Sequence, residues 1–110
     1  QIKFLFNLDM IADNNPKQYC EFNDVAMEGY ALFEKINAEK GYFEALDRHD
    51  LDENSDHWPF AKKNVPVVFF MNEHGDAYKY YHTVHDTYQN HISTNYEPSF
   101  KIIEDFIKRY

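Results

Sequence analysis

The chain has 110 residues, of which 44% are hydrophobic and 18% aromatic, enough for the packed core of one small domain. Its formal net charge of -8 argues against a nucleic-acid partner, because a surface that binds phosphates needs clustered Lys and Arg. The single cysteine, Cys20, excludes an intramolecular disulfide and a multi-cysteine zinc site. No apolar run reaches the length of a membrane span, so we expect no membrane partner.

The first predicted element is a buried strand over residues 2–9, "IKFLFNLD", because Ile, Phe and Leu occupy both of its faces. The chain has no initiator Met and opens directly in this apolar run. We therefore expect a fragment whose upstream part, with any targeting signal, has been removed.

An amphipathic helix is predicted within residues 22–41, after turn chemistry in "NNPKQYC" at 14–20. Asn23 or Asp24 can cap the start of this helix, and Gly41 can end it. Its apolar residues recur at helical spacing: Phe22, Val25, Ala26, Tyr30, Phe33 and Ile36.

The second half of the chain continues the alternation of strands and helices. A short strand at 42–47 and an acidic loop at 48–57 lead to a short helix from Trp58 to Lys63. Residues 65–71, "VPVVFFM", predict a second strongly apolar strand, and residues 97–110 predict the closing helix. One apolar stripe is expected along that helix, from Ile102, Ile103, Phe106, Ile107 and Tyr110.

Two near-continuous apolar strands predict an α/β fold whose sheet is covered on both faces, of the parallel or mixed kind. We treat residues 1–110 as one domain. Three strands and two long helices are few for such a sheet, which again indicates that part of the domain is missing.

Two polar residues stand where a site is expected. Asp9 follows a buried strand, and ligands of open α/β sheets bind at the carboxyl ends of strands; the alternative is an Asp that caps a turn. His82 follows the strand at 65–71 by a short loop, and histidine is the commonest metal-binding side chain; the alternative is a solvated imidazole. We interpret His85 and His91 as surface groups.

Four segments in order carry a resemblance to a known family: "NLDMI", "SDHWPF", "VPVVFF" and "YYHTVHDT". Together they resemble the C-terminal half of the catalytic domain of zinc-dependent aminopeptidases, the co-catalytic group that includes the bacterial leucyl aminopeptidases. The match extends from residue 7 to residue 87, most of the chain. It implies a mixed, largely parallel sheet sandwiched by helices, with two zinc ions at the carboxyl ends of the central strands.

The resemblance also implies roles for single residues. Asp9 would bind one zinc and His82 the other, and Tyr81 would stabilise the oxyanion of the tetrahedral intermediate. The family's first His, bridging Asp and Glu pair precede the "NLDMI" motif and are absent from this chain. Ala12 departs from the usual Gly of the family, which concerns the geometry of the loop and not the ligand.

Three further residues are implied near the metals. Asp56 and His57, in "SDHWPF", match a motif beside the metal site, where they would orient ligands or line the substrate pocket. Asp86, with Thr87, would hold the loop that presents His82.

The implied function is the release of N-terminal residues from peptide substrates by the parent protein. The isolated chain is expected to be inactive, and activity could return if the missing N-terminal half of the domain were supplied by another chain. A secreted or periplasmic location is favoured by the resemblance alone.

Three alternatives stay open. A glutaminyl cyclase resembles the same fold but uses a single zinc for acyl transfer, and "NLDMI" favours the peptidase. A non-catalytic α/β module would use Asp9 as a turn cap and His82 as a surface imidazole. A dipeptidase or carboxypeptidase-like member is the third, because the residues that select the chain end lie mainly in the missing half.

Overall fold

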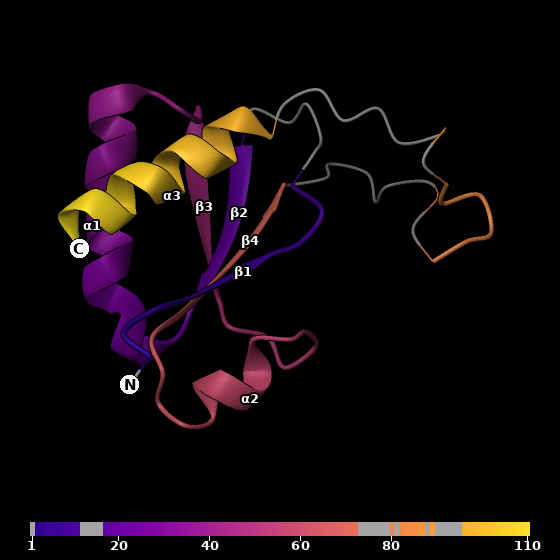
Figure 1. Cartoon of the computed structure of the whole chain (residues 1–110), viewed down its shortest axis with the longest axis horizontal. Coiled ribbons are helices and arrows are strands. Elements are labelled where there is room, and N and C mark those ends of the chain that lie inside the picture. Colours follow the sequence, from indigo (N-terminus) through magenta and orange to yellow (C-terminus); the bar gives the residue numbers. More distant parts are fainter. Residues whose placement is uncertain (1, 12–16, 73–79, 81, 88, 90–95) are drawn as a thin grey trace.

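The computed structural model describes residues 2–11, 17–72, 80, 82–87, 89 and 96–110. Its centre is a four-stranded sheet with the order β1-β4-β2-β3 (Figure 1). The strands are β1 (Leu5–Leu8), β2 (Lys17–Phe22), β3 (Ala45–Asp50) and β4 (Val67–Asn72). β1 is parallel to β4 and β2 is parallel to β3, whereas β2 and β4 are antiparallel. The predicted α/β fold with a mixed, mostly parallel sheet is confirmed.

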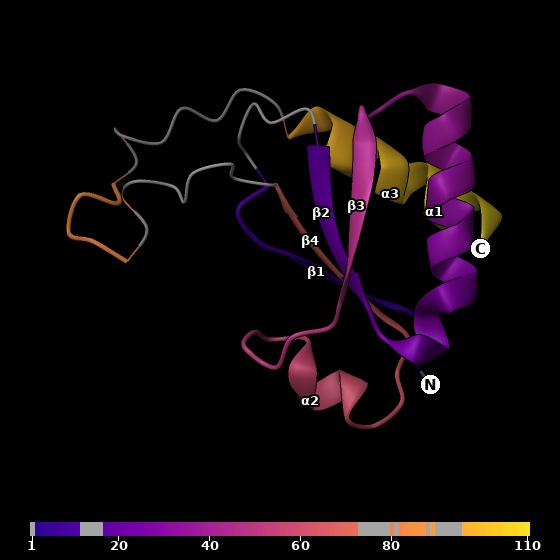
Figure 2. The ribbon, with the colours of Figure 1, turned by 180° about the vertical axis from the view of Figure 1, so that it is seen from behind.

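Three helices accompany the sheet: α1 (Met27–Lys40), α2 (Trp58–Ala61) and α3 (Glu97–Arg109). α1 and α3 cover one face of the strands, and α2 lies at the end where β3 finishes and β4 begins (Figures 1 and 2). Among the described residues, no helix has the length and apolar content that crossing a bilayer requires.

Aromatic rings fill the space between the two long helices and the sheet. The rings of Phe33 on α1 and Phe106 on α3 are stacked, with centroids 4.4 Å apart. Phe6 on β1 meets Phe106 edge-on at 5.4 Å, and Phe70 on β4 meets Phe33 at 5.1 Å. Such edge-to-face and stacked pairs add to the gain from burial alone, so this cluster holds the helices on the sheet.

The turn predicted at residues 14–20 is wrong from residue 17 onwards, because β2 begins there. The reason is a buried polar residue. Gln18 is fully buried, and its amide donates to the Met71 carbonyl and accepts a hydrogen bond from the Ser99 hydroxyl at 3.1 Å. Hydrogen bonds of this kind offset the free-energy cost of desolvating an amide, so a strand can carry polar residues on the face that the helices cover.

The helical segment begins near the predicted position, with Asn23 as the N-cap residue of a 3-10 turn (Asp24–Ala26), and its predicted end is confirmed, but the side chain of Asn23 does not cap it. Asn23 makes no capping hydrogen bond and instead joins the segment before β4, donating to the Val65 carbonyl at 2.8 Å and accepting the Val67 N–H at 3.0 Å. Gly41 ends α1 in the left-handed region, with φ of 65°, and its N–H donates to the Asn37 carbonyl. Glycine adopts this conformation without a steric cost.

Other boundaries differ by a few residues. The strand predicted at 2–9 is the shorter β1, and the strand predicted at 42–47 lies three residues later, as β3. The predicted stripe of the closing helix divides in two: Ile102 and Phe106 are buried, but Ile107 and Tyr110 are 65% and 51% exposed. The sheet therefore covers one flank of α3 and leaves another uncovered.

Candidate active site

Asp9 directly follows β1 at the carboxyl end of the strand. Its N–H donates to the Phe70 carbonyl at 3.0 Å, which ties the backbone of Asp9 to β4. The next residue, Met10, has φ of 50°, so the chain turns sharply there, and the Asp9 side chain is exposed. Because β1 and β4 are parallel, Asp9 stands at the end of the sheet where both strands finish, which is where α/β sheets bind ligands.

The segment 82–87 forms a tight turn that Thr83 holds together. The Thr83 hydroxyl donates to the Tyr80 carbonyl at 2.8 Å and accepts the His85 N–H at 3.2 Å. His82 has φ of 55°, and both His82 and Asp86 are exposed. The Asp86 N–H donates to the Thr83 carbonyl. The hydroxyl of Thr83 therefore helps to hold this turn, and the role expected of Asp86 stays a prediction.

The described structure does not bring the two predicted ligands together. Segment 82–87 stands apart from the strands in both views of the ribbon (Figures 1 and 2). No group of three or more His, Cys, Asp or Glu within the described ranges is placed to hold a metal ion. Asp9 and His82 remain predicted ligands, and Tyr81 and His91 lie outside the described residues.

His57 is fully buried and connects the loop after β3 to β1. Its Nε2 donates to the Asp52 carbonyl at 2.7 Å, which fixes the proton on that nitrogen, since a carbonyl can only accept. Its Nδ1 therefore accepts from the Asn7 amide at 3.2 Å, and the same amide donates to the Ser55 hydroxyl at 2.9 Å. With both nitrogens occupied, His57 holds this loop against β1 two residues before Asp9.

The neighbouring Asp56 is exposed and is not part of the hydrogen-bond network around His57. The His57 ring also contacts the Phe69 ring, at a centroid distance of 5.2 Å. Asn7, Phe69 and His57 thus lie on the face of the sheet opposite α1 and α3.

Sequence reasoning missed a buried carboxylate on this second face. Glu21 is 4% exposed; one of its oxygens accepts the Tyr19 hydroxyl and the other accepts the Asp52 N–H, each at 2.8 Å. Burial and the hydrogen bond to Glu21 raise the pKa of Tyr19 well above its ordinary value, so the phenol stays protonated and keeps donating. No local pattern signals Glu21, because its partners come from β2 and from the distant loop.

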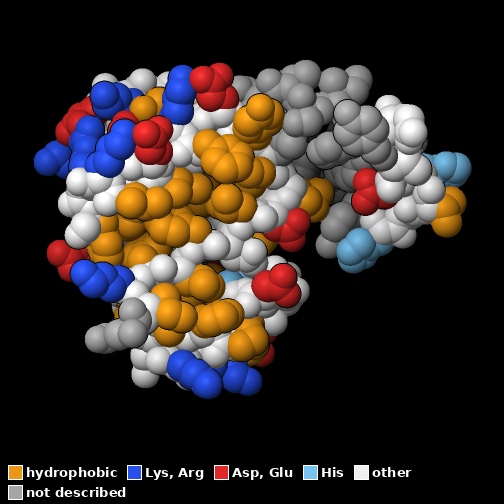
Figure 3. Space-filling view, in the orientation of Figure 1, with side chains coloured by type: hydrophobic (Ala, Val, Ile, Leu, Met, Phe, Trp, Pro, Cys, Tyr) orange, Lys and Arg blue, Asp and Glu red, His pale blue; other side chains and the backbone are white. Residues whose placement is uncertain are grey.

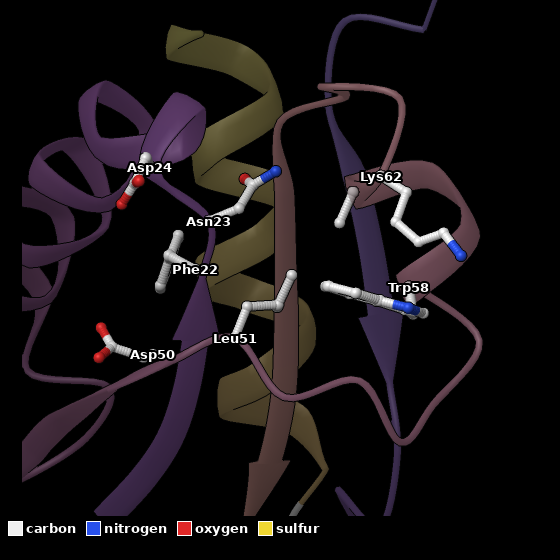
Figure 4. Close-up of a pocket in the computed structure, with 8 residues that line it drawn as sticks. Phe22, Asn23, Asp24, Asp50, Leu51, Trp58 and Lys62 are labelled. Carbon is white, nitrogen blue, oxygen red and sulfur yellow. The ribbon is translucent and has the colours of Figure 1, made fainter.

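A pocket of about 390 Å³ opens at the other end of the sheet, where β2 and β3 finish (Figure 4). Lys62 and Trp58 lie on one side of it, with the ammonium 5.9 Å from the ring centroid, and the carboxylates of Asp24 and Asp50 lie on the other. None of its lining residues is a predicted site residue. This pocket is therefore separate from the end of β1 that displays Asp9.

The model of Peptidase family M28 matches residues 1–107. No curated protein and no solved structure matches the chain. The match extends through β1, the loop with His57, β4 and α3, and so through every element that builds the end of the sheet beside Asp9. The chain belongs to Peptidase family M28, whose members are generally zinc-dependent peptidases.

Proposed function

We propose that this chain is part of a zinc-dependent aminopeptidase in which Asp9 binds one zinc ion and His82 binds a second. The observation that carries the proposal is the position of Asp9: an exposed carboxylate, with its backbone tied to Phe70, at the shared carboxyl end of two parallel strands. Carboxylate oxygens and imidazole nitrogens are ordinary zinc ligands.

The donor types fit zinc, but the described residues do not assemble a complete site. As the resemblance implies, we assign the remaining ligands, a His, a bridging Asp and one Glu of a pair whose other Glu is the general base, to the part of the peptidase that precedes "NLDMI". When bound, a pair of zinc ions supplies an activated water and polarises the carbonyl of the peptide to be cleaved.

The chain's own residues have supporting roles in this proposal. His57 fixes the loop against β1 and so limits the movement of the strand that ends in Asp9. Tyr81 donates to the developing oxyanion, and the turn around Thr83 presents His82. The substrate is a peptide with an unblocked N-terminus.

Zinc affinity tests the role of Asp9 without relying on activity. In the peptidase that holds this chain and the remaining ligands, Asp9→Asn should weaken zinc binding by at least about tenfold, because a neutral amide is a poor substitute for a carboxylate ligand. The affinity is measured by competition with a chromophoric chelator. Asp24→Asn, a change in the pocket at the far end of the sheet, should leave the affinity unchanged.

Equal zinc affinity of the Asp9→Asn variant and the unmodified protein would contradict the assignment of Asp9 as a zinc ligand. The reaction is tested on the same preparation with two substrates. Release of an N-terminal residue from a peptide supports the aminopeptidase, whereas cyclisation of an N-terminal glutamine without release of a residue would replace it with a glutaminyl cyclase.

A further inference from the structure

The mixed sheet has a second set of carboxyl ends, opposite the end that displays Asp9. β2 and β3 are parallel to each other and antiparallel to β4, so both finish where β4 begins. Their last residues, Phe22 and Asp50, are partners in the register, and the pocket of about 390 Å³ opens beside them (Figure 4). Ligands of open α/β sheets bind at the carboxyl ends of strands, and this volume is within the range of small-molecule pockets. The pocket is therefore a second place where this fold can bind a ligand.

Hydrogen bonds fix the wall of the pocket that β2 provides. The side chain of Asn23 donates to the Val65 carbonyl at 2.8 Å and accepts the Val67 N–H at 3.0 Å, which ties the end of β2 to the start of β4. Phe22, the preceding residue, is 2% exposed. This wall is already ordered before a ligand arrives, which lowers the entropic cost of binding.

The wall that α2 provides is apolar. It contains Trp58 and Ala61, and in the view of Figure 4 Leu51 lies between Trp58 and Asp50. Hydrophobic side chains gather over α2 and the segment that leads to β4 (Figure 3). The Lys62 ammonium lies 5.9 Å from the centroid of the Trp58 ring, within the distance at which a cation is attracted to a ring face. This wall can therefore contact the methylene groups of a ligand, and its ring already attracts one cation.

Two carboxylates lie across the pocket from that wall. Figure 4 shows Asp24 and Asp50 on one side, with Trp58 and Lys62 on the other. Among the described residues, none forms a hydrogen bond or an ion pair with the Asp24 carboxylate. Asp50 pairs with Arg48 at 3.8 Å through a fully exposed side chain, and a contact of this kind contributes little. Both carboxylates thus keep acceptor oxygens that a ligand can use.

The charges of the pocket decide which ligand fits. An anion would meet both carboxylates on a chain whose net charge is -8. Within the described ranges, no three His, Cys, Asp or Glu gather to hold a metal ion. A guanidinium is planar and has five N–H donors, so it can serve two carboxylates at once, and the methylene stem of arginine packs well on apolar side chains.

We propose that the pocket at the ends of β2 and β3 binds the guanidinium group of an arginine side chain. The guanidinium donates to Asp24 and Asp50, and the methylene stem lies along Leu51 and the Trp58 ring. The Lys62 ammonium repels the bound cation, so the carboxylates favour binding and Lys62 opposes it. None of these residues is a proposed zinc ligand, so this inference does not depend on the proposed function.

Trp58 is the only tryptophan of the chain, so its fluorescence reports directly on the pocket. When N-acetylarginine amide is titrated into the 110-residue chain, the fluorescence should change and reach saturation. N-acetylcitrulline amide has a side chain of the same length without the charge and should cause no saturable change. A parallel titration with free arginine distinguishes two sources of the group. Tighter binding than that of the amide indicates the free amino acid, and equal or weaker binding indicates an arginine within a polypeptide.

Charge variants test the roles of the lining residues. Asp24→Asn and Asp50→Asn should each weaken binding about two- to fivefold, because each removes one charged acceptor at an exposed position. Glu44→Gln, directly before β3 at the opposite end of that strand, removes the same charge and should leave the affinity unchanged. Lys62→Met should strengthen binding about twofold, whereas Lys63→Met, at the exposed neighbour, should have a smaller effect.

Equal responses to the arginine and citrulline amides would overturn the proposal, because the pocket would then not recognise the charge. A fluorescence change that grows linearly without saturation would overturn it as well, since that is collisional quenching. The same holds if the two aspartate variants bind as tightly as Glu44→Gln. Thermal melting of each variant shows that the fold is intact, so a loss of affinity at an unchanged melting temperature is assigned to the pocket.

Discussion

The side-chain amide of Asn7 lies 3.2 Å from Nδ1 of His57, although 50 positions separate the two residues. The other ring nitrogen donates to the Asp52 carbonyl, so the imidazole joins β1 to both ends of a loop. A buried ring with both nitrogens in use is a rigid connection. The rigidity of the strand that ends in Asp9 therefore depends in part on a residue that is distant in sequence from both proposed metal ligands, Asp9 and His82.

Replacing His57 with Ala should lower the free energy of unfolding by about 2 to 4 kcal/mol, because it leaves a cavity and removes the hydrogen bonds that join the Asn7 amide and the Asp52 carbonyl through the ring. Urea denaturation of the 110-residue chain measures the loss. His85→Ala, at an exposed imidazole, is the matched control and should change stability by less than about 0.5 kcal/mol. Similar losses for the two variants would contradict a structural role for His57.

Glu21→Gln tests the buried carboxylate on the same face of the sheet. A glutamine offers one acceptor oxygen where Glu21 offers two, so the Tyr19 hydroxyl and the Asp52 N–H can no longer both donate to it, and the hydrogen bonds that remain are no longer charge-assisted. We expect a loss of about 1 to 3 kcal/mol in the free energy of unfolding. Glu34 also accepts a tyrosine hydroxyl, from Tyr30, but is exposed, so Glu34→Gln should cost less than about 0.5 kcal/mol. If both changes cost the same, burial does not strengthen the Glu21 contacts.

The strands that could be predicted from the sequence are those whose buried residues are hydrophobic. β1 and β4 lie within near-continuous runs of Ile, Val, Phe and Leu, so the sequence located them within a few residues. β2 escaped prediction because Gln18 and Glu21 are buried through hydrogen bonds to residues far along the chain. Sequence patterns indicate local hydrophobicity but do not reveal hydrogen-bond partners that lie far along the chain.

The candidate site divides in the same way. The position of Asp9 at the carboxyl end of β1 was predictable, because an acidic residue directly after an apolar strand needs no distant information, whereas its role as a ligand stays a prediction. The hydrogen bond between Asn7 and His57 was not predictable, because it depends on how the loop after β3 folds back on β1. His57 was expected to orient ligands or line a pocket; the structure shows that its ring nitrogens bind Asn7 and the Asp52 carbonyl.

Gly29, in α1, should not tolerate a side chain. A Cβ at this position would collide with the ring of Phe4 and lie 3.4 Å from Phe106. The Phe4 ring cannot move aside easily, because it packs against Phe6 and Phe106 at 5.1 and 4.9 Å. We expect Gly29→Ala to destabilise the chain by about 1 to 3 kcal/mol, although alanine favours helices by about 1 kcal/mol over glycine.

Relief of the collision distinguishes this cause from others. In the double variant Gly29→Ala with Phe4→Leu, the smaller side chain leaves room for the new methyl group, so the two changes should cost less together than the sum of their separate costs in urea denaturation. Additive costs would show that the Phe4 ring is not the obstacle.

The contact between Tyr42 and Asp105 should make stability depend on pH. The Tyr42 hydroxyl donates to the Asp105 carboxylate at 2.8 Å, and this bond lowers the pKa of Asp105 below its ordinary value. A group whose pKa is lower in the folded state stabilises the fold above its unfolded pKa, about 3.9 for Asp, and loses that contribution as the pH falls through the folded pKa.

In Tyr42→Phe the pKa of Asp105 should rise towards its ordinary value, and NMR titration of the carboxyl carbon measures this rise. The difference in melting temperature between the two proteins should be present at pH 7 and shrink below about pH 4. Tyr30→Phe removes a hydroxyl that bonds elsewhere and should leave the Asp105 titration unchanged; an Asp105 pKa that is the same with and without the Tyr42 hydroxyl would refute the assigned cause.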